Sequence, residues 1–196
     1  MSISKLSNRF AVQECFSRAF MLRFVRGCAS ETFTSKFASE VGGTLSQTGP
    51  VVGSFAVCHH VFTQEATNDF ALLCGDNNPL HIDPEFANTT MFGGTIVHGI
   101  FVSSLFSTLF GRSLHGAIYV SQTLNFKQPV YVGAHVRAQI EVLTIERKRK
   151  GYLLTCSTNA FTKNINNSNK EEVLAISGEA KCLLPFSAYP EVQASV

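Results

Sequence analysis

The sequence Gly-Asp-Asn-Asn-Pro-Leu-His at residues 75–81 places a carboxylic acid and an imidazole five positions apart, around an Asn-Pro turn. Asp76 and His81 on one tight loop can act as a general acid–base pair, one accepting a proton while the other donates. The same stretch is also a strong turn sequence, because Asn and Asp side chains bond to the nearby backbone. Spacing alone leaves both interpretations open.

A second stretch, Ile-Val-His-Gly at residues 96–99, opens the most apolar segment of the chain, residues 96–110. Apolar residues fall on nearly every face of this segment, which predicts a helix buried all round. The N–H of Gly99 at its start can stabilise negative charge on a carbonyl oxygen. Glycine also lets a substrate approach the backbone closely. His98 has an alternative interpretation as a helix cap, and His81 as a core histidine.

Together the two stretches suit the elimination of water from a β-hydroxy carbonyl compound. A base must take the Cα proton, an acid must protonate the departing hydroxyl, and a donor must hold the carbonyl oxygen. Asp76 and His81 fit the first two roles and Gly99 fits the third, while Asn78 can anchor the water or hydroxyl. Such acid–base chemistry requires no metal and no redox cofactor.

The surrounding pattern predicts two short helices and several strands. Thr63 begins a helix that Gly75 ends, with Phe70 and Leu73 on its apolar face, and residues 76–81 follow as an ordered loop. A second helix begins after Asp83, with Pro84 at its first position. One strand is expected at residues 51–61, and the last third alternates as strands do. These later strands are expected at residues 117–126, 136–142, 154–160 and 174–182. We expect an α+β fold in which an antiparallel sheet wraps around the buried helix.

Composition restricts the class of protein. The chain has 196 residues and a formal charge of +2, which is too small to indicate a nucleic-acid partner. It has no run of ~18 apolar residues that could span a bilayer. None of its six cysteines forms a C-x-x-C pair, which favours free thiols in a reducing compartment.

Residues 1–45 are rich in Arg and Ser and poor in acids, with apolar residues interspersed. This amphipathic pattern predicts a transit peptide and linker that direct the chain to the mitochondrial matrix, although a disordered basic tail has a similar composition. The remaining residues, 46–196, are expected to form one domain.

Two blocks resemble the hydratase motif of the MaoC-like (R)-specific enoyl-thioester hydratase/dehydratase family. They are Phe-Ala-Leu-Leu-Cys-Gly-Asp-Asn-Asn-Pro-Leu-His-Ile-Asp-Pro-Glu-Phe-Ala at residues 70–87 and Phe-Gly-Gly-Thr-Ile-Val-His-Gly at residues 92–99. Agreement continues through residues 104–107 and 124–133, and covers roughly residues 50–185. The resemblance implies a hot-dog fold, a long helix wrapped by an antiparallel sheet, and a homodimer in which two sheets run together.

The resemblance also implies roles for single residues. Asp76 and His81 would be the catalytic pair, with Asn78 assisting. The N–H of Gly99 would hold the thioester carbonyl, and Ser107 matches a polar position near the acyl pocket.

Thr95 makes the second block most similar to mitochondrial 3-hydroxyacyl-thioester dehydratases, whereas Asn77 replaces an aromatic residue that family members often carry. The implied reaction is the reversible dehydration of (3R)-3-hydroxyacyl thioesters to trans-2-enoyl thioesters. The implied substrate carrier is acyl carrier protein, in mitochondrial fatty acid synthesis. One alternative is an (R)-specific enoyl-CoA hydratase of fatty acid oxidation. Lys127 and the basic residues 147–150 could meet either an acidic carrier or a CoA phosphate, although such a run is more commonly a solvated turn.

Two further alternatives share the fold. A non-catalytic acyl-thioester-binding subunit would need a tunnel but not the acid–base pair, so the presence of both Asp76 and His81 argues against it. A thioesterase would need a water activated at the carbonyl carbon, and the motif is not of that type.

Overall fold

The computed structural model describes residues 41–45, 49–163, 171–190 and 192. Most of the predicted transit peptide therefore lies outside the described residues. Within these ranges no helix is both long and apolar enough to cross a membrane.

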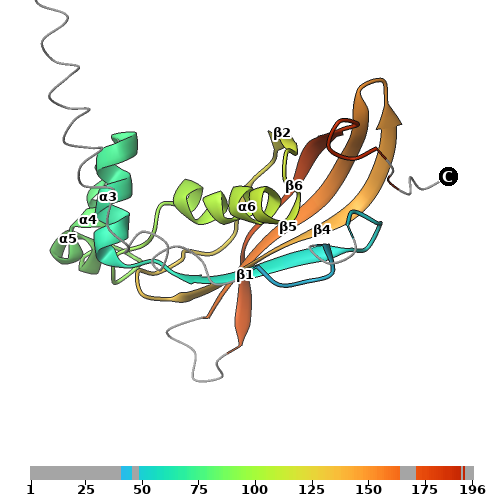
Figure 1. The fold of residues 1–196 in the computed structure, drawn as a ribbon. Coiled ribbons are helices and arrows are strands. Elements are labelled where there is room, and N and C mark those ends of the chain that lie inside the picture. The colour runs from blue at the N-terminus through green and yellow to red at the C-terminus, as the bar shows by residue number, and fades with distance from the viewer. Residues whose placement is uncertain (1–40, 46–48, 164–170, 191, 193–196) are drawn as a thin grey trace, which may run out of the picture. The chain divides into compact units, whose positions relative to one another are not determined.

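A six-stranded antiparallel sheet forms the largest part of the described chain (Figure 1). Its strands pair in the order β1-β4-β5-β6-β2, and β3 also pairs with β6. In β4 and β5 buried and less buried residues alternate, which confirms the period-two pattern of the last third. The strands are β1 (Phe55–Val61), β2 (Ile118–Gln122), β3 (Asn125–Phe126), β4 (His135–Lys148), β5 (Gly151–Lys163) and β6 (Glu172–Pro185).

The single strand expected at residues 117–126 is wrong, because the chain breaks there into β2 and β3. At Thr123 the side-chain hydroxyl, rather than a backbone carbonyl, accepts the N–H of Glu179 at 3.0 Å. The register against β6 also shifts between Tyr119 and Ser121. These irregularities let the chain end one strand and start another beside β6.

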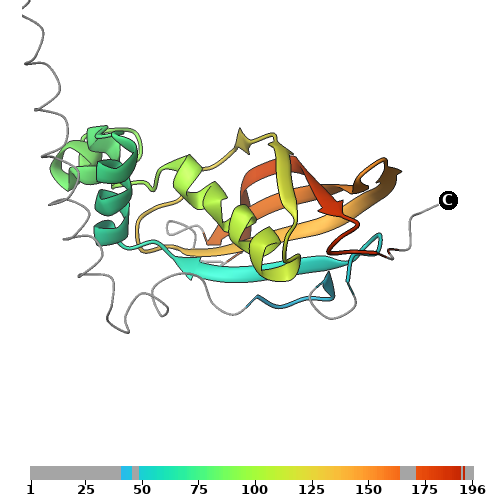
Figure 2. The same ribbon diagram turned by 45° about the horizontal axis from the view of Figure 1, so that its top comes forward.

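Helix α6 (Gly99–Ser113) packs along one face of the sheet, as Figures 1 and 2 show. The wrapped-helix prediction is thus confirmed. The expectation that the helix is buried all round is wrong, since Ile100 is 58% exposed and Ser107 and Gly111 are also exposed. The sheet covers only one side of the helix, and the buried residues form an ordinary amphipathic stripe. That stripe consists of Phe101, Val102, Leu105, Phe106, Leu109 and Phe110.

Helix α3 (Gln64–Cys74) has the ends predicted for it. The Thr63 side chain accepts a hydrogen bond from the N–H of Ala66, and Gly75 ends the helix with φ 82°. The predicted apolar face is wrong at Leu73, which is 82% exposed. The buried side chains, Thr67 and Ala71, lie one turn apart on one face, and Leu73, two positions after Ala71, lies about 200° further round the helix and faces away from them.

The stretch after Gly75 contains a further short helix where only an ordered loop was expected. Helix α4 (Pro79–Ile82) begins with Asn78 as its cap and proline at its first position. Helix α5 (Pro84–Asn88) follows with Asp83 as its cap, as predicted. Helices α3, α4 and α5 group beyond the N-terminal end of α6 (Figure 2), so the two motif stretches meet where α6 begins.

Residues 41–45 lie against the sheet. Gly42 and Val57 of β1 exchange two backbone hydrogen bonds of 2.9 and 2.8 Å, and Leu45 is only 1% exposed. This part of the predicted leader and linker therefore belongs to the folded domain.

The buried His60 is expected to make stability depend on pH. Burial lowers the pKa of His60 from its ordinary value of 6.5. An unfolded chain therefore binds a proton near pH 6.5 that the folded chain binds only at lower pH. The stabilising contribution of neutral His60 is present above pH 6.5 and is lost as the pH falls toward the folded-state pKa. We expect the drop in Tm between about pH 7.5 and about pH 5.5 to be smaller in His60→Gln than in the wild type.

The neighbouring His59 supplies the matched control for this measurement, because it lies on the same strand and is exposed. His59→Gln should keep the wild-type drop in Tm, measured by circular dichroism at both pH values. An unchanged drop in His60→Gln would contradict the assignment.

Candidate active site

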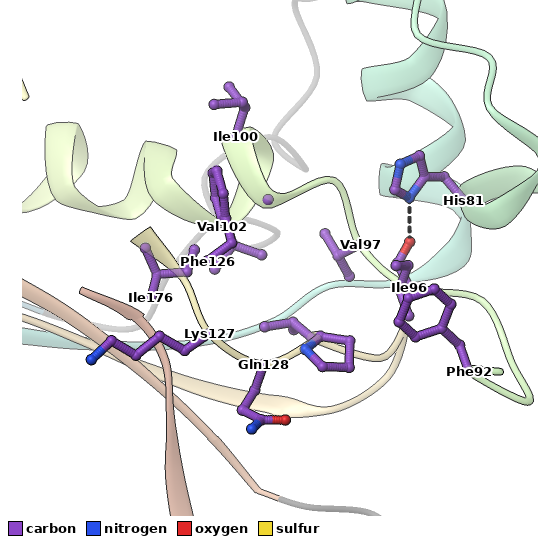
Figure 3. Close-up of a pocket in the computed structure, with 13 residues that line it drawn as sticks. His81, Phe92, Ile96, Val97, Ile100, Val102, Phe126, Lys127, Gln128 and Ile176 are labelled. Carbon is purple, nitrogen blue, oxygen red and sulfur yellow. Dashed lines mark hydrogen bonds between the residues drawn. The ribbon is translucent and has the colours of Figure 1, made fainter. Parts of the chain in front are cut away.

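His81 lies on α4, and a hydrogen bond holds its ring in place. Its Nδ1 is 2.7 Å from the backbone carbonyl oxygen of Ile96 (Figure 3). Because a carbonyl can only accept, Nδ1 carries the hydrogen, and Nε2 of the neutral ring keeps a free lone pair. His81 is therefore in the tautomer that can accept a proton at Nε2.

Gln64 of α3 holds the backbone of His81 in place through hydrogen bonds of its side chain. Its Nε2 donates to the carbonyl oxygen of His81 at 2.7 Å, and its Oε1 accepts from the hydroxyl of Thr95 at 2.9 Å. One side chain thus connects α4 to the strand-like segment before α6. Sequence patterns did not predict this role, because Gln64 is recognisable only as a polar residue on a helix.

Asp76 follows the turn made by Gly75. Its Oδ1 accepts the N–H of Asn78 at 3.2 Å, and its side chain is 55% exposed. The Asn78 side chain accepts from the N–H of Leu80 and so caps α4. Asn78 does not line either of the two cavities described below. Its contact with the substrate therefore stays a prediction.

His98 joins the two predicted catalytic residues in one cluster. One ligand atom each from Asp76, His81 and His98 lie within 4.8 Å of one another. The Nε2 of His98 is 3.0 Å from the carbonyl oxygen of Asp76, and its ring stacks on that of His81 with centroids 3.8 Å apart. The structure thus brings Asp76 and His81 together, as the motif predicts.

This cluster has the composition of a metal site, but its ring geometry does not suit one. The His81 and His98 rings are inclined by only 29°, so their in-plane lone pairs run in nearly parallel layers. One ring nitrogen of each already faces a backbone carbonyl. A tetrahedral cation needs lone pairs that converge on one point about 2 Å away.

Two cavities meet at the start of α6. The larger, of about 410 Å³, is lined mainly by apolar side chains, and the smaller, of about 280 Å³, contains Asp76 and His98. His81, Gly99 and Ile100 line both. Figure 3 shows the larger cavity, where the amino group of Lys127 is directed away from His81. Its apolar lining includes Phe92, Ile96, Val97, Val102, Phe126 and Ile176.

Gly99 is the first residue of α6, where backbone N–H groups have no partner within the helix. A β-carbon at this position would lie 2.5 Å from Cε1 of Phe126, so only glycine fits without displacement of that ring. Phe126 comes from β3, far along the sequence, and its part in the site was not predicted. Ser107 lies on the exposed side of α6, and its contact with an acyl chain stays a prediction.

The geometry can be compared with known proteins. The family described as MaoC-like domain matches residues 44–164. The chain belongs to the MaoC-like family. It therefore has the family's hot-dog fold, and the resemblance seen in the two motif blocks is confirmed.

Named MaoC-like relatives include enzymes of two kinds. The mitochondrial 3-hydroxyacyl-(acyl-carrier-protein) dehydratase of Arabidopsis thaliana is 34% identical, over 76% of this chain and 84% of its own length. The (R)-specific enoyl-CoA hydratase of Aeromonas caviae is 44% identical, over 59% of this chain and 81% of its own length.

A solved structure of the (R)-hydratase from A. caviae superposes with a TM-score of 0.63 at 41% identity. The match covers 70% of this chain and 99% of that one. The MaoC-like fold thus accounts for nearly the whole length of that enzyme.

Proposed function

We propose that this chain is a hydro-lyase that interconverts (3R)-3-hydroxyacyl thioesters and trans-2-enoyl thioesters. The observation that carries the proposal is the position of Asp76, His81 and the N–H of Gly99 around the junction of an apolar and a polar cavity. Both named relatives catalyse reactions of this type, which supports it.

The spacing of Asp76 and His81 suits one water molecule or one substrate hydroxyl. Their closest ligand atoms lie within 4.8 Å of each other. Two hydrogen bonds of about 2.8 Å that meet at one oxygen span roughly 5 Å. The carboxylate and Nε2 of neutral His81 are both acceptors, so a water between them donates both of its hydrogens.

A single proton then moves during hydration. His81 Nε2 takes one proton from the water while the water oxygen bonds to C3 of the enoyl thioester. The electron pair of the C2–C3 double bond passes through C2 to the carbonyl oxygen. The imidazolium returns the proton to C2, which completes the addition of water, and dehydration is the reverse. His81 thus carries out both of the proton transfers that the sequence divides between Asp76 and His81. Asp76 orients the water, while Nδ1–H of His81 stays on the carbonyl of Ile96.

The thioester carbonyl lies against the N-terminus of α6 in this proposal. The N–H of Gly99 and the helix dipole stabilise the enolate oxygen as negative charge develops there. The acyl chain occupies the 410 Å³ cavity, whose apolar lining extends from Ile96 to Ile176.

Acyl carrier protein is the proposed carrier, in mitochondrial fatty acid synthesis in the matrix. The mitochondrial relative from Arabidopsis supports this choice. The relative from A. caviae, an (R)-specific enoyl-CoA hydratase, supports the alternative that this chain acts on CoA thioesters. The exposed Lys127 at the larger cavity can meet the phosphate group that both carriers possess.

The proposed assembly is a homodimer, since β2 lies at the end of the sheet and exposes Ile118 and Val120.

The direct test is an enoyl-thioester hydration assay with purified protein, followed by loss of enoyl absorbance. Crotonyl-CoA and crotonyl-acyl carrier protein are compared at equal concentration. We expect hydration of both, with the higher kcat/KM on the carrier protein. Binding without turnover of either substrate would instead identify an acyl-binding subunit, and a higher kcat/KM on CoA would favour the alternative.

The proposed import signal makes a separate prediction. A fluorescent protein fused behind residues 1–45 should accumulate in mitochondria because of its basic, amphipathic front end. The control carries Glu in place of Arg9, Arg18, Arg23 and Arg26 and should stay in the cytosol. A cytosolic signal from the unaltered fusion would reject the targeting proposal.

A further inference from the structure

We propose that His98 is a positioning residue that holds Asp76 and His81 in a fixed arrangement relative to Gly99. This inference rests on the proposed hydration reaction. In the mechanism above, His98 does not contact the substrate during hydration or dehydration. Its ring nevertheless contacts both members of the catalytic pair, Asp76 and His81. It also directly precedes the residue that holds the carbonyl oxygen.

The first contact fixes the backbone at Asp76. His98 Nε2 lies 3.0 Å from the carbonyl oxygen of Asp76, so this nitrogen is the donor. It is also 3.9 Å from Oδ2 of the same residue. The Asp76 side chain is 55% exposed, so little packing restrains the loop that carries it. A donor from the buried interior gives that loop a fixed point.

The second contact fixes the ring of His81. His98 stacks on it at 3.8 Å and is held from another side by Phe70, at 5.1 Å edge to face. Phe70 in turn stacks on Phe101 of α6 at 4.5 Å, with the rings inclined by 8°. The rings of His98 and Phe70 therefore connect His81 to α6, the helix whose first residue is Gly99.

Packing alone does not account for a histidine here. His98 is 3% exposed, and its Nδ1 is buried without a hydrogen-bond partner among the described residues. Nor does its side chain cap α6. A buried polar atom without a partner is unfavourable, so phenylalanine would satisfy packing better. The Nε2–H is the feature that phenylalanine lacks.

Three substitutions separate the donor from the ring. Gln places its side-chain nitrogen close to the position of Nε2, whereas Asn places one close to the position of Nδ1, and Phe keeps the stacking ring but has no donor. We expect His98→Phe and His98→Asn to lower kcat about 30-fold with KM within about twofold of the wild type, because small displacements of reacting groups are costly. His98→Gln should recover to within about fivefold of the wild-type kcat.

Thermal unfolding and the fold seen by circular dichroism are measured on all three variants. Equal kcat in His98→Phe and the wild type would overturn the proposal. So would a loss of kcat in His98→Gln as large as in His98→Asn, since the position of the donor would then be irrelevant.

A readout without turnover keeps this inference distinct from the proposed function. Long-range ¹H–¹⁵N spectra of the imidazoles report which ring nitrogen carries hydrogen. We expect Nε2–H at His98 and Nδ1–H at His81 in the wild type, and loss of the single-tautomer signal of His81 in His98→Asn, which removes both the stacking ring and the donor at Nε2. If the wild type hydrates no enoyl thioester, the proposed function fails, and these spectra still decide whether His98 orders the cluster. An Nδ1–H tautomer at His98 would overturn the inference.

Discussion

Asp76→Asn is expected to lower kcat/KM for crotonyl-thioester hydration by about 10²-fold, mostly through kcat, because the reacting water is no longer held in place. The amide oxygen of asparagine can still accept the N–H of Asn78, as Oδ1 of Asp76 does now. The amide nitrogen then replaces Oδ2 and presents a donor where the water requires an acceptor. The loop geometry is retained while the water loses its orientation.

Asp83 provides the control for this change. It is an exposed carboxylate that caps α5 by accepting from Glu85 and Phe86, and asparagine caps helices equally well. Asp83→Asn removes the same charge close by in the sequence and should keep the wild-type rate. A full rate in Asp76→Asn would show that the carboxylate has no role in the chemistry.

Gly99→Ala is the second large effect that we expect, with kcat about 10²-fold lower. The added methyl would lie 2.5 to 2.7 Å from two ring carbons of Phe126 and would occupy the approach to the N–H. Folding should survive, because Phe126 is 55% exposed and its ring can turn outward. Alanine also favours the helix more than glycine does.

Two variants separate the possible causes. Gly111→Ala lies on the same helix, with nothing within 4 Å of the added methyl, and should raise Tm without changing kcat. Phe126→Ala combined with Gly99→Ala relieves the ring contact while the methyl still blocks the carbonyl. If the double variant regained the kcat of Phe126→Ala alone, the obstruction would be the ring and not the access of substrate to the N–H.

Local sequence chemistry predicted the parts of this fold that depend on neighbours in the chain. Thr63 and Gly75 bound α3, and Asp83 begins α5, because capping and turn preferences act over a few residues. Predictions of burial failed where they depended on a partner element. The Leu73 side chain is exposed, and one side of α6 is uncovered, because the sheet reaches only one face of that helix.

The site was predictable to the same extent. The sequence predicted Asp76, His81 and Gly99 as site residues, and in the structure all three lie at the two cavities that meet at the start of α6. It could not identify the backbone carbonyl of Ile96, because every residue has one. Phe126 reaches the site through the pairing of β3 with β6, a long-range contact that no local pattern encodes.

The pairing of Gly42 with Val57 sets a limit on trimming at the front of the chain. β1 is the last strand on its side of the sheet, and residues 41–45 cover part of its outer rim. A processing protease that cut after Leu45 would leave N–H and C=O groups of β1 open to pairing with another chain. In the proposed import route, processing should therefore end ahead of Gly42, and a form that begins after Leu45 would be prone to self-association.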